Sequence, residues 1–158
     1  GDWSSDVCSS DLRLALQGRL EGREPVSMLM IGAGGLECAG VLAELAPAGA
    51  AVECRVVSGW PQVAQAVVER GRERLPGVAF SALAPLVPGA LVERLQGSRF
   101  DLIVVHLQDP CAAEAAALLE RRAAAGEADG LVMVVAPPET DSLRLLLDLT
   151  GQIGRAHV

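Results

Sequence analysis

Val26-Ser27-Met28-Leu29-Met30-Ile31-Gly32-Ala33-Gly34-Gly35 is the stretch that decides the fold of this 158-residue chain. Its first six residues are an apolar run with the length of a buried strand. The glycines that follow turn the chain, because glycine adopts backbone conformations that other residues avoid. A helix is predicted next, at Leu36 to Leu45, and it ends before Pro47 and Gly49. This order is typical of the start of a parallel sheet.

The same alternation continues along the chain. Further strands are predicted at Ala51 to Val57, Val78 to Phe80, Phe100 to His106 and Leu131 to Val135. Further helices are predicted at Pro61 to Leu75, Gly89 to Gln96, Cys111 to Ala125 and Thr140 to Leu149. Strand and helix thus alternate five times, which predicts an α/β domain with a doubly wound, mostly parallel sheet.

The two ends of the chain resemble translated sequencing-adapter DNA. Residues 1–12 match one strand of a common short-read adapter, and residues 153–158 match the other strand in a compatible frame. Artificial ends are excluded from fold reasoning. We therefore expect one domain at Arg13 to Gln152, cut from a longer reading frame, with no contribution of either end to its core. Arg13 to Pro25 is expected to be a helix tail or a linker.

Composition argues against several classes of function. The formal net charge is −7 and the sequence has no lysine, so we expect no nucleic-acid partner. No apolar run has the length of a membrane span, so no membrane partner is expected. Cys38, Cys54 and Cys111 form no CxxC spacing, which argues against a disulfide framework and a metal site and favours a reducing cytoplasm.

Three segments are predicted to reach the carboxyl edge of the sheet, where open α/β sheets bind their ligands. The first is Gly32, Ala33, Gly34 and Gly35. Glycines let backbone N–H groups approach a ligand closely, and the following helix start favours negative or polar groups. A tight strand-to-helix turn without a ligand requires the same residues, so the two interpretations stay open.

The second segment contains Ser58 and Trp60. Nucleotide-binding sheets commonly place an acidic residue there to bind ribose hydroxyls, and this chain offers only Ser58. Trp60 is expected to stack on an adenine ring or, as the favoured alternative, to cover the core beside a helix.

The third segment is His106 to Pro110, after the fourth strand. Imidazole titrates near neutral pH, so His106 is the candidate general base, with a hydrogen-bonded structural histidine as the more common alternative. Cys111 lies near a helix start, which can lower the pKa of a thiol, although a small buried side chain is favoured. Cys38 and Cys54 are predicted to be core residues.

The order of elements resembles that of class I methyltransferases that use S-adenosylmethionine. The residues that carry the resemblance are Leu29 to Leu36, Phe100 to Val105 and Leu131 to Val135, and it covers nearly all of Arg13 to Gln152. Pro137 to Gly151 is similar to the methyltransferase domains of type I polyketide synthases and the related animal fatty acid synthase. The resemblance implies a Rossmann-like fold of seven strands, truncated here after the fifth strand–helix unit. It also implies S-adenosylmethionine as cofactor, and neighbouring synthase domains and a carrier-bound acyl chain as partners.

The departures from that family concern its acidic residues. Met30 stands where the first strand usually carries an acid, Ser58 stands where the second strand ends in one, and Ser81 to Leu83 has none. Each lost charge-assisted hydrogen bond costs roughly 1.5–3 kcal/mol of cofactor binding. Two or three losses weaken affinity by orders of magnitude. We therefore expect a degenerate, structural methyltransferase-like domain in which cofactor binding is weak or lost.

Three alternatives remain at this stage. The first is an active C-methyltransferase in which His106 removes the proton from the acceptor carbon. The second is an NAD(P)-binding domain, although the glycine turn lacks a third spaced glycine and a ribose-binding acid. The third is a receiver-like signalling domain, in which His106 or Leu107 occupies the approximate place of the phosphorylated aspartate.

Overall fold

Strands and helices alternate along the chain in a computed structural model that describes residues 11–83, 90–95, 97–126 and 131–135. A helix at residues 11–16 comes first. The elements that follow are β1 (Val26–Ile31), α2 (Leu36–Leu45), β2 (Val52–Val57), α3 (Pro61–Arg74), β3 (Val78–Ala82), α4 (Ala90–Arg94), β4 (Leu102–His106), α5 (Ala112–Ala124) and β5 (Leu131–Val135). The predicted elements in these ranges are confirmed, with ends that differ by at most two residues. The helix predicted at Thr140 to Leu149 lies outside the described residues.

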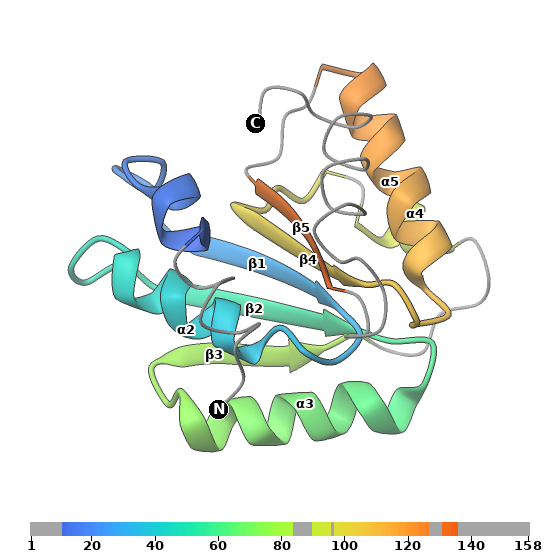
Figure 1. Cartoon of the computed structure of the whole chain (residues 1–158), viewed down its shortest axis with the longest axis horizontal. Coiled ribbons are helices and arrows are strands. Elements are labelled where there is room, and N and C mark those ends of the chain that lie inside the picture. Colours follow the sequence, from blue (N-terminus) through green and yellow to red (C-terminus); the bar gives the residue numbers. More distant parts are fainter. Residues whose placement is uncertain (1–10, 84–89, 96, 127–130, 136–158) are drawn as a thin grey trace.

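The five strands form one parallel sheet in the order β3-β2-β1-β4-β5 (Figure 1). Met30 in the central strand β1 pairs with Val56 of β2 and Val104 of β4. The chain adds β2 and β3 on one side of β1, then returns to add β4 and β5 on the other side. The strand order therefore reverses between β1 and β4, as in a doubly wound Rossmann-like fold. The predicted fold class is confirmed.

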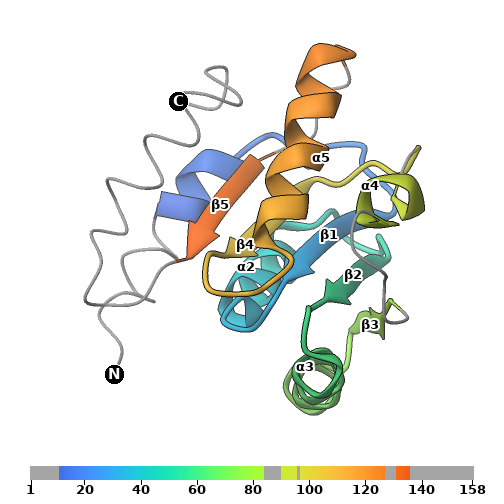
Figure 2. The ribbon, with the colours of Figure 1, turned by 90° about the vertical axis from the view of Figure 1, so that its right-hand side faces the viewer.

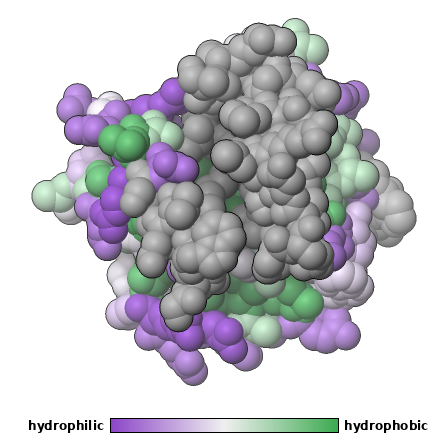
Figure 3. Space-filling model, in the orientation of Figure 1, coloured by the Kyte–Doolittle hydropathy of each residue, from purple (hydrophilic) through white to green (hydrophobic). Residues whose placement is uncertain are grey.

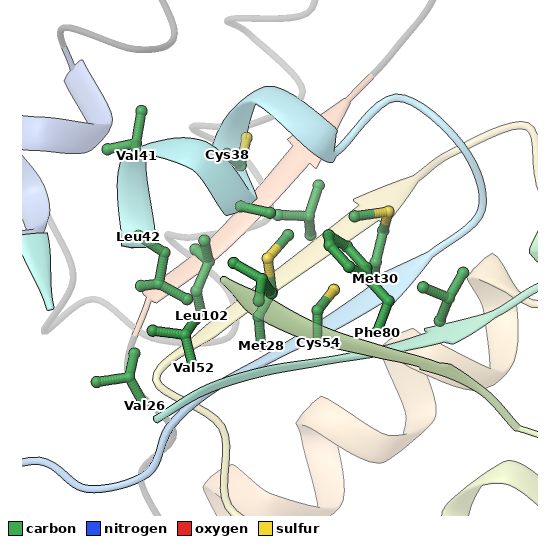
Figure 4. Packing of buried hydrophobic residues seen from close by; sticks show 14 of the residues in the cluster. Val26, Met28, Met30, Cys38, Val41, Leu42, Val52, Cys54, Phe80 and Leu102 are labelled. Carbon is green, nitrogen blue, oxygen red and sulfur yellow. The ribbon is translucent and has the colours of Figure 1, made fainter. Parts of the chain in front are cut away.

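Helices cover both faces of the sheet. One core cluster joins residues of α2 and α3 to one face, and a second cluster joins residues of α4 and α5 to the other face (Figure 2). Alternate residues of β1 divide between them: Met28 and Met30 belong to the first cluster, and Leu29 and Ile31 to the second. Figure 4 shows side chains of the first cluster between the strands and α2. Burial on both faces explains why β1 is apolar throughout.

Helix α3 packs directly on β3 because one of its residues has no side chain. A Cβ atom at Gly71 would lie 2.7 Å from the Phe80 ring. Pro61 occupies the first position of this helix, where a missing N–H costs no hydrogen bond. The outer side of α3 carries charged residues, and Figure 3 shows hydrophilic surface along the corresponding lower margin of the molecule.

The N-terminal region corrects one expectation. Leu12, assigned above to the artificial end, is 2% exposed and lies in the first core cluster with Leu16 and Leu20. A spacing of four residues places Leu12 and Leu16 on one side of the helix at residues 11–16, which explains why both reach the core. The expectation that residues 1–12 contribute nothing to the core is wrong for Leu12, and residues 1–10 lie outside the described part.

Neither a membrane-spanning helix nor a cluster of metal-binding side chains occurs among the described residues. None of the helices in that part of the chain is both long and apolar enough to cross a membrane. Nor does that part contain a group of three or more histidine, cysteine, aspartate or glutamate side chains placed to hold a metal ion.

Candidate functional site

Three loops meet at the carboxyl edge of the sheet, beside the point where the strand order reverses. They follow β1, β2 and β4. The Gly32 N–H donates to the Val57 carbonyl oxygen at 2.7 Å, which joins the first loop to the end of β2. A Cβ atom at Gly32 would lie 3.0 Å from the Cβ atoms of both His106 and Asp109. The prediction that the three segments share one edge of the sheet is confirmed.

The glycine turn needs glycine at two positions for conformational reasons. Gly32 and Gly34 have φ angles of +85° and +94°, in a region that other residues rarely adopt. Gly35 is the N-cap of α2, and a Cβ atom there would lie 3.1 Å from Cγ of Met30. Ala33 and Gly34 are exposed, whereas Gly32 and Gly35 are buried. The exposed pair is therefore the part of the turn that faces solvent.

Met30 fills the space beneath this turn. Its side chain is fully buried, and its Cγ, Sδ and Cε atoms all lie within 3.3 Å of the position that a Cβ of Gly35 would take. Figure 4 shows the Met30 side chain on the same side of the sheet as α2. A carboxylate at this position would be enclosed by apolar groups, which disfavours its charged form. The space in which the resembled family carries an acid is thus occupied by a thioether.

Asp109 joins the loops after β2 and β4 by hydrogen bonds and lies against Gly32 of the loop after β1. Its carboxylate accepts hydrogen bonds from the Ser58 hydroxyl at 2.6 Å, from the Gly59 N–H at 2.9 Å and from the Cys111 N–H at 2.9 Å. Asp109 is only 4% exposed. The bond to the amide two residues ahead is a local turn that aspartate commonly forms. The bonds to Ser58 and Gly59 join segments about fifty residues apart and hold the loop after β4 over the ends of β1 and β2.

The backbone of the second loop approaches the third loop closely. A Cβ atom at Gly59 would lie 2.5 Å from Cβ of Pro110, so only glycine permits this contact. Ser58 was predicted as a site residue from the sequence, whereas the roles of Asp109 and Gly59 were not. The available signal was Asp109-Pro110 at a predicted helix start, a common place for an aspartate that bonds the backbone.

Trp60 differs from the favoured expectation. It is 48% exposed, so the prediction that it covers the core is wrong. The residue is the N-cap of α3, and its N–H donates to the Ser58 hydroxyl oxygen at 3.0 Å. Because Trp60 precedes the first turn of the helix, its side chain does not join the buried side of α3. Whether its exposed ring stacks on a ligand stays a prediction.

His106 ends β4 beside the glycine turn. It is partly buried, and its Nδ1 accepts a hydrogen bond from the Gln108 N–H at 3.3 Å. Its Cβ lies against Gly32, as described above, so the ring belongs to the same edge as the three loops. This hydrogen bond to the Gln108 backbone agrees with a structural role for His106. The role of His106 as a general base stays a prediction.

The cysteine thiols are core groups. Burial, together with the nearby carboxylates of Asp109 and Glu114, raises the pKa of Cys111 to about 11. The alternative of a lowered Cys111 pKa is therefore wrong, because burial and two nearby carboxylates outweigh the helix start, and the favoured prediction of a small buried side chain is confirmed. Burial also raises the pKa of Cys54 to about 12. Cys38, Cys54 and Cys111 are all buried, which confirms their predicted place in the core.

Comparison with known proteins gives similarity of fold. No protein-family model and no curated protein matches the chain. Among solved structures, the chain is similar to quinate dehydrogenase from Corynebacterium glutamicum in complex with NAD, with 19% identity and a TM-score of 0.49 over 92% of this chain and 48% of that one. It is also similar to the tRNA N6-threonylcarbamoyladenosine dehydratase of E. coli, with 12% identity and a TM-score of 0.47 over 78% of this chain and 54% of that one. The chain thus spans about half the length of each.

Proposed function

We propose that this chain is a structural, non-catalytic Rossmann-like domain of methyltransferase type, and that Asp109 closes its cofactor crevice from within. One observation carries the proposal. The Asp109 carboxylate takes the hydrogen bonds of the Ser58 hydroxyl and the Gly59 N–H at the end of β2. In nucleotide-binding sheets the polar groups at that point face the ribose of the cofactor. Here they are satisfied by the protein itself.

The residues present do not fit S-adenosylmethionine. The buried thioether of Met30 fills the place of one acid, and the Ser58 hydroxyl, which stands in place of another, is engaged by Asp109. A ligand seated against Gly32 would first have to displace Asp109 and His106, whose Cβ atoms already reach that glycine. Breaking the hydrogen bonds of the buried Asp109 carboxylate costs free energy. The arrangement in which Asp109 binds Ser58 and Gly59 is therefore the stable one.

The NAD(P)-binding alternative is less well supported. A dinucleotide places a pyrophosphate at the glycine turn, and in this chain the Asp109 carboxylate lies beside Gly32, with Oδ2 3.1 Å from where a Cβ would stand. Two negative groups at such short range repel each other strongly when they are shielded from water. The same repulsion disfavours a receiver-like role, which requires a phosphoryl group at the same edge.

A structural role predicts partners that are proteins. The resemblance to synthase methyltransferase domains suggests neighbouring domains of a multidomain biosynthetic protein as those partners. A carrier-bound acyl chain would be needed by an active domain, and under this proposal the domain does not bind it.

Calorimetric titration of the full chain with S-adenosylmethionine, and separately with NAD, tests the proposal. The expected result is no saturable heat up to millimolar ligand. The same ligand solutions titrated into an active methyltransferase and an active dehydrogenase are the positive controls, and circular dichroism verifies that the chain is folded. Saturable binding of S-adenosylmethionine at micromolar strength would overturn the proposal in favour of an active methyltransferase, and saturable binding of NAD in favour of a dinucleotide domain.

A further inference from the structure

A cavity of about 330 Å³ lies at the amino edge of the sheet, opposite the three loops described above. It is lined by the segment before β1, the first half of β2 and the segment before β4, namely Gly22, Arg23, Glu24, Pro25, Ser27, Met28, Glu53, Arg55, Ser98, Arg99 and Phe100. Ligand pockets usually have volumes of about 300–1,000 Å³. The cavity is therefore large enough for a small metabolite.

The cavity exists because the first half of β2 is not covered on one face. Glu53 is exposed and Arg55 partly exposed, and they alternate with the buried Cys54. Parallel sheets normally bury both faces under helices and are apolar on both. Helix α4 has five residues, and among the described residues it contributes none to the cavity lining. Two charged side chains on a strand face therefore mark a surface that meets solvent or a ligand.

The walls of the cavity are held together by Asp101. Its carboxylate pairs with Nε of Arg23 at 2.7 Å and accepts a hydrogen bond from the Ser27 N–H at 2.9 Å. The Ser27 hydroxyl donates to the Arg99 carbonyl oxygen at 2.8 Å. These bonds fix the segment before β1 against the segment before β4. A site whose walls are already ordered loses less conformational entropy when it binds a ligand.

Two guanidinium groups at this cavity remain available for a ligand. Three of the chain's 13 arginines line it, although the formal net charge of the chain is −7. Asp101 neutralises Arg23. Arg55 donates one long hydrogen bond, of 3.3 Å, to the Ser98 hydroxyl oxygen. The described part of the chain provides no acid within 4.0 Å of the Arg55 or Arg99 guanidinium.

We propose that this cavity binds a small ligand that carries an oxyanion, either a carboxylate or a phosphate, together with a hydrogen-bond donor. Arg55 and Arg99 hold the oxyanion, since the guanidinium group donates two parallel hydrogen bonds to such groups. Glu53, on the same face of β2 as Arg55, accepts from the hydroxyl or ammonium group of the ligand. The site lies on the opposite edge of the sheet from Asp109 and does not depend on the structural role proposed above.

Titration of the ¹⁵N-labelled full chain, followed by NMR, tests this site. The probes are inorganic phosphate and, separately, succinate, each at constant ionic strength with sodium chloride as the control. We expect saturable amide shifts confined to residues 22–27, 53–55 and 98–100. Saturation by only one probe identifies the oxyanion as phosphate or carboxylate. Shifts that do not saturate with either probe, or that sodium chloride reproduces, would overturn the proposal.

Matched variants locate the interaction. Arg55→Gln and Arg99→Gln should each weaken the apparent Kd about tenfold or more, since each removes a charge-assisted hydrogen bond. Arg70→Gln removes an exposed arginine of α3 outside the cavity and should leave the Kd unchanged. Arg99 is exposed, so its variant should remain folded even if Arg55→Gln does not. An unchanged Kd in Arg99→Gln would contradict the assignment.

Discussion

Replacement of Asp109 by alanine should destabilise the domain more than any exposed acidic substitution. The carboxylate accepts hydrogen bonds from Ser58, Gly59 and Cys111, and a hydrogen bond to a charged group contributes about 1.5–3 kcal/mol. Ser58 is partly exposed and Gly59 is exposed, so water can accept the hydrogen bonds that these two residues donate to Asp109 in the unsubstituted chain. The Cys111 residue is buried, and an unsatisfied buried N–H costs about 1–3 kcal/mol. We expect a net loss of roughly 3 kcal/mol in the free energy of unfolding.

Asp109→Asn should cost much less. The amide oxygen can keep both backbone N–H donors, and the amide NH₂ can donate to the Ser58 hydroxyl oxygen, which has a second lone pair besides the one used by the Trp60 N–H. The remaining loss is that of the charge, about 1 kcal/mol. Urea denaturation followed by circular dichroism at 222 nm measures both variants. Glu73→Ala, an exposed acid of α3, is the control. A loss for Asp109→Ala no larger than that of Glu73→Ala would refute the reasoning.

Three further predictions concern the glycine turn and the buried thiols. Gly32→Ala should lower the free energy of unfolding by about 2–3 kcal/mol, because alanine is strained at φ +85° and its Cβ would crowd Asp109. The control is Gly77→Ala, because no atom lies within 4 Å of the position that a Cβ of Gly77 would take. In the same urea assay, Gly77→Ala should change the free energy of unfolding by less than about 0.5 kcal/mol. The raised pKa values of Cys54 (about 12) and Cys111 (about 11) favour the protonated thiols in the folded state. Their stabilisation is therefore complete below the ordinary pKa of 9.0 and is lost as pH rises toward 11 and 12. The thermal midpoint should fall above about pH 9, and a slope unchanged in Cys54→Ala would contradict the assignment to that thiol. Cys111 should also react with iodoacetamide at pH 8 far more slowly than a thiol in a short peptide, because only about 0.1% of Cys111 is thiolate at that pH. Peptide mapping by mass spectrometry measures the rate, and equal rates for Cys111 and the peptide thiol would contradict the burial of Cys111.

The sequence predicted the fold because the signals for it are local. The apolar run of β1 and the glycines after it define strand and turn within ten residues, and Pro61 marks the start of α3. Parallel strands joined by single helices then leave few possible topologies. Leu12 was expected outside the core, but its spacing of four residues from Leu16 places both on the buried side of the first helix.

The candidate site was predicted only in part because its key contacts are distant in the sequence. The three loops were placed at one edge correctly, since the carboxyl ends of parallel strands share that edge. The pairing of Asp109 with Ser58 spans 51 residues, and no local pattern reveals it. Trp60 was expected in the core because of its hydrophobic ring, but its place before the first turn of α3 leaves it exposed.

The arginine cavity was missed for the same reason. Arg23, Arg55 and Arg99 come from three separate segments. In the sequence each resembles an ordinary solvated charge, and only the sheet brings them to one edge.

We propose above that the carboxyl edge of this sheet is closed by Asp109 and binds no nucleotide cofactor. The most direct test is an NMR titration of the ¹⁵N-labelled full chain with S-adenosylmethionine up to millimolar concentration, followed at the amides of Gly32, Gly34, Gly59 and Cys111. We expect that none of these signals moves in a saturable way, because Asp109 accepts the hydrogen bonds of the Gly59 and Cys111 N–H groups and lies against Gly32, beside the exposed Gly34. Saturable shifts of the same amides with a micromolar midpoint would contradict it.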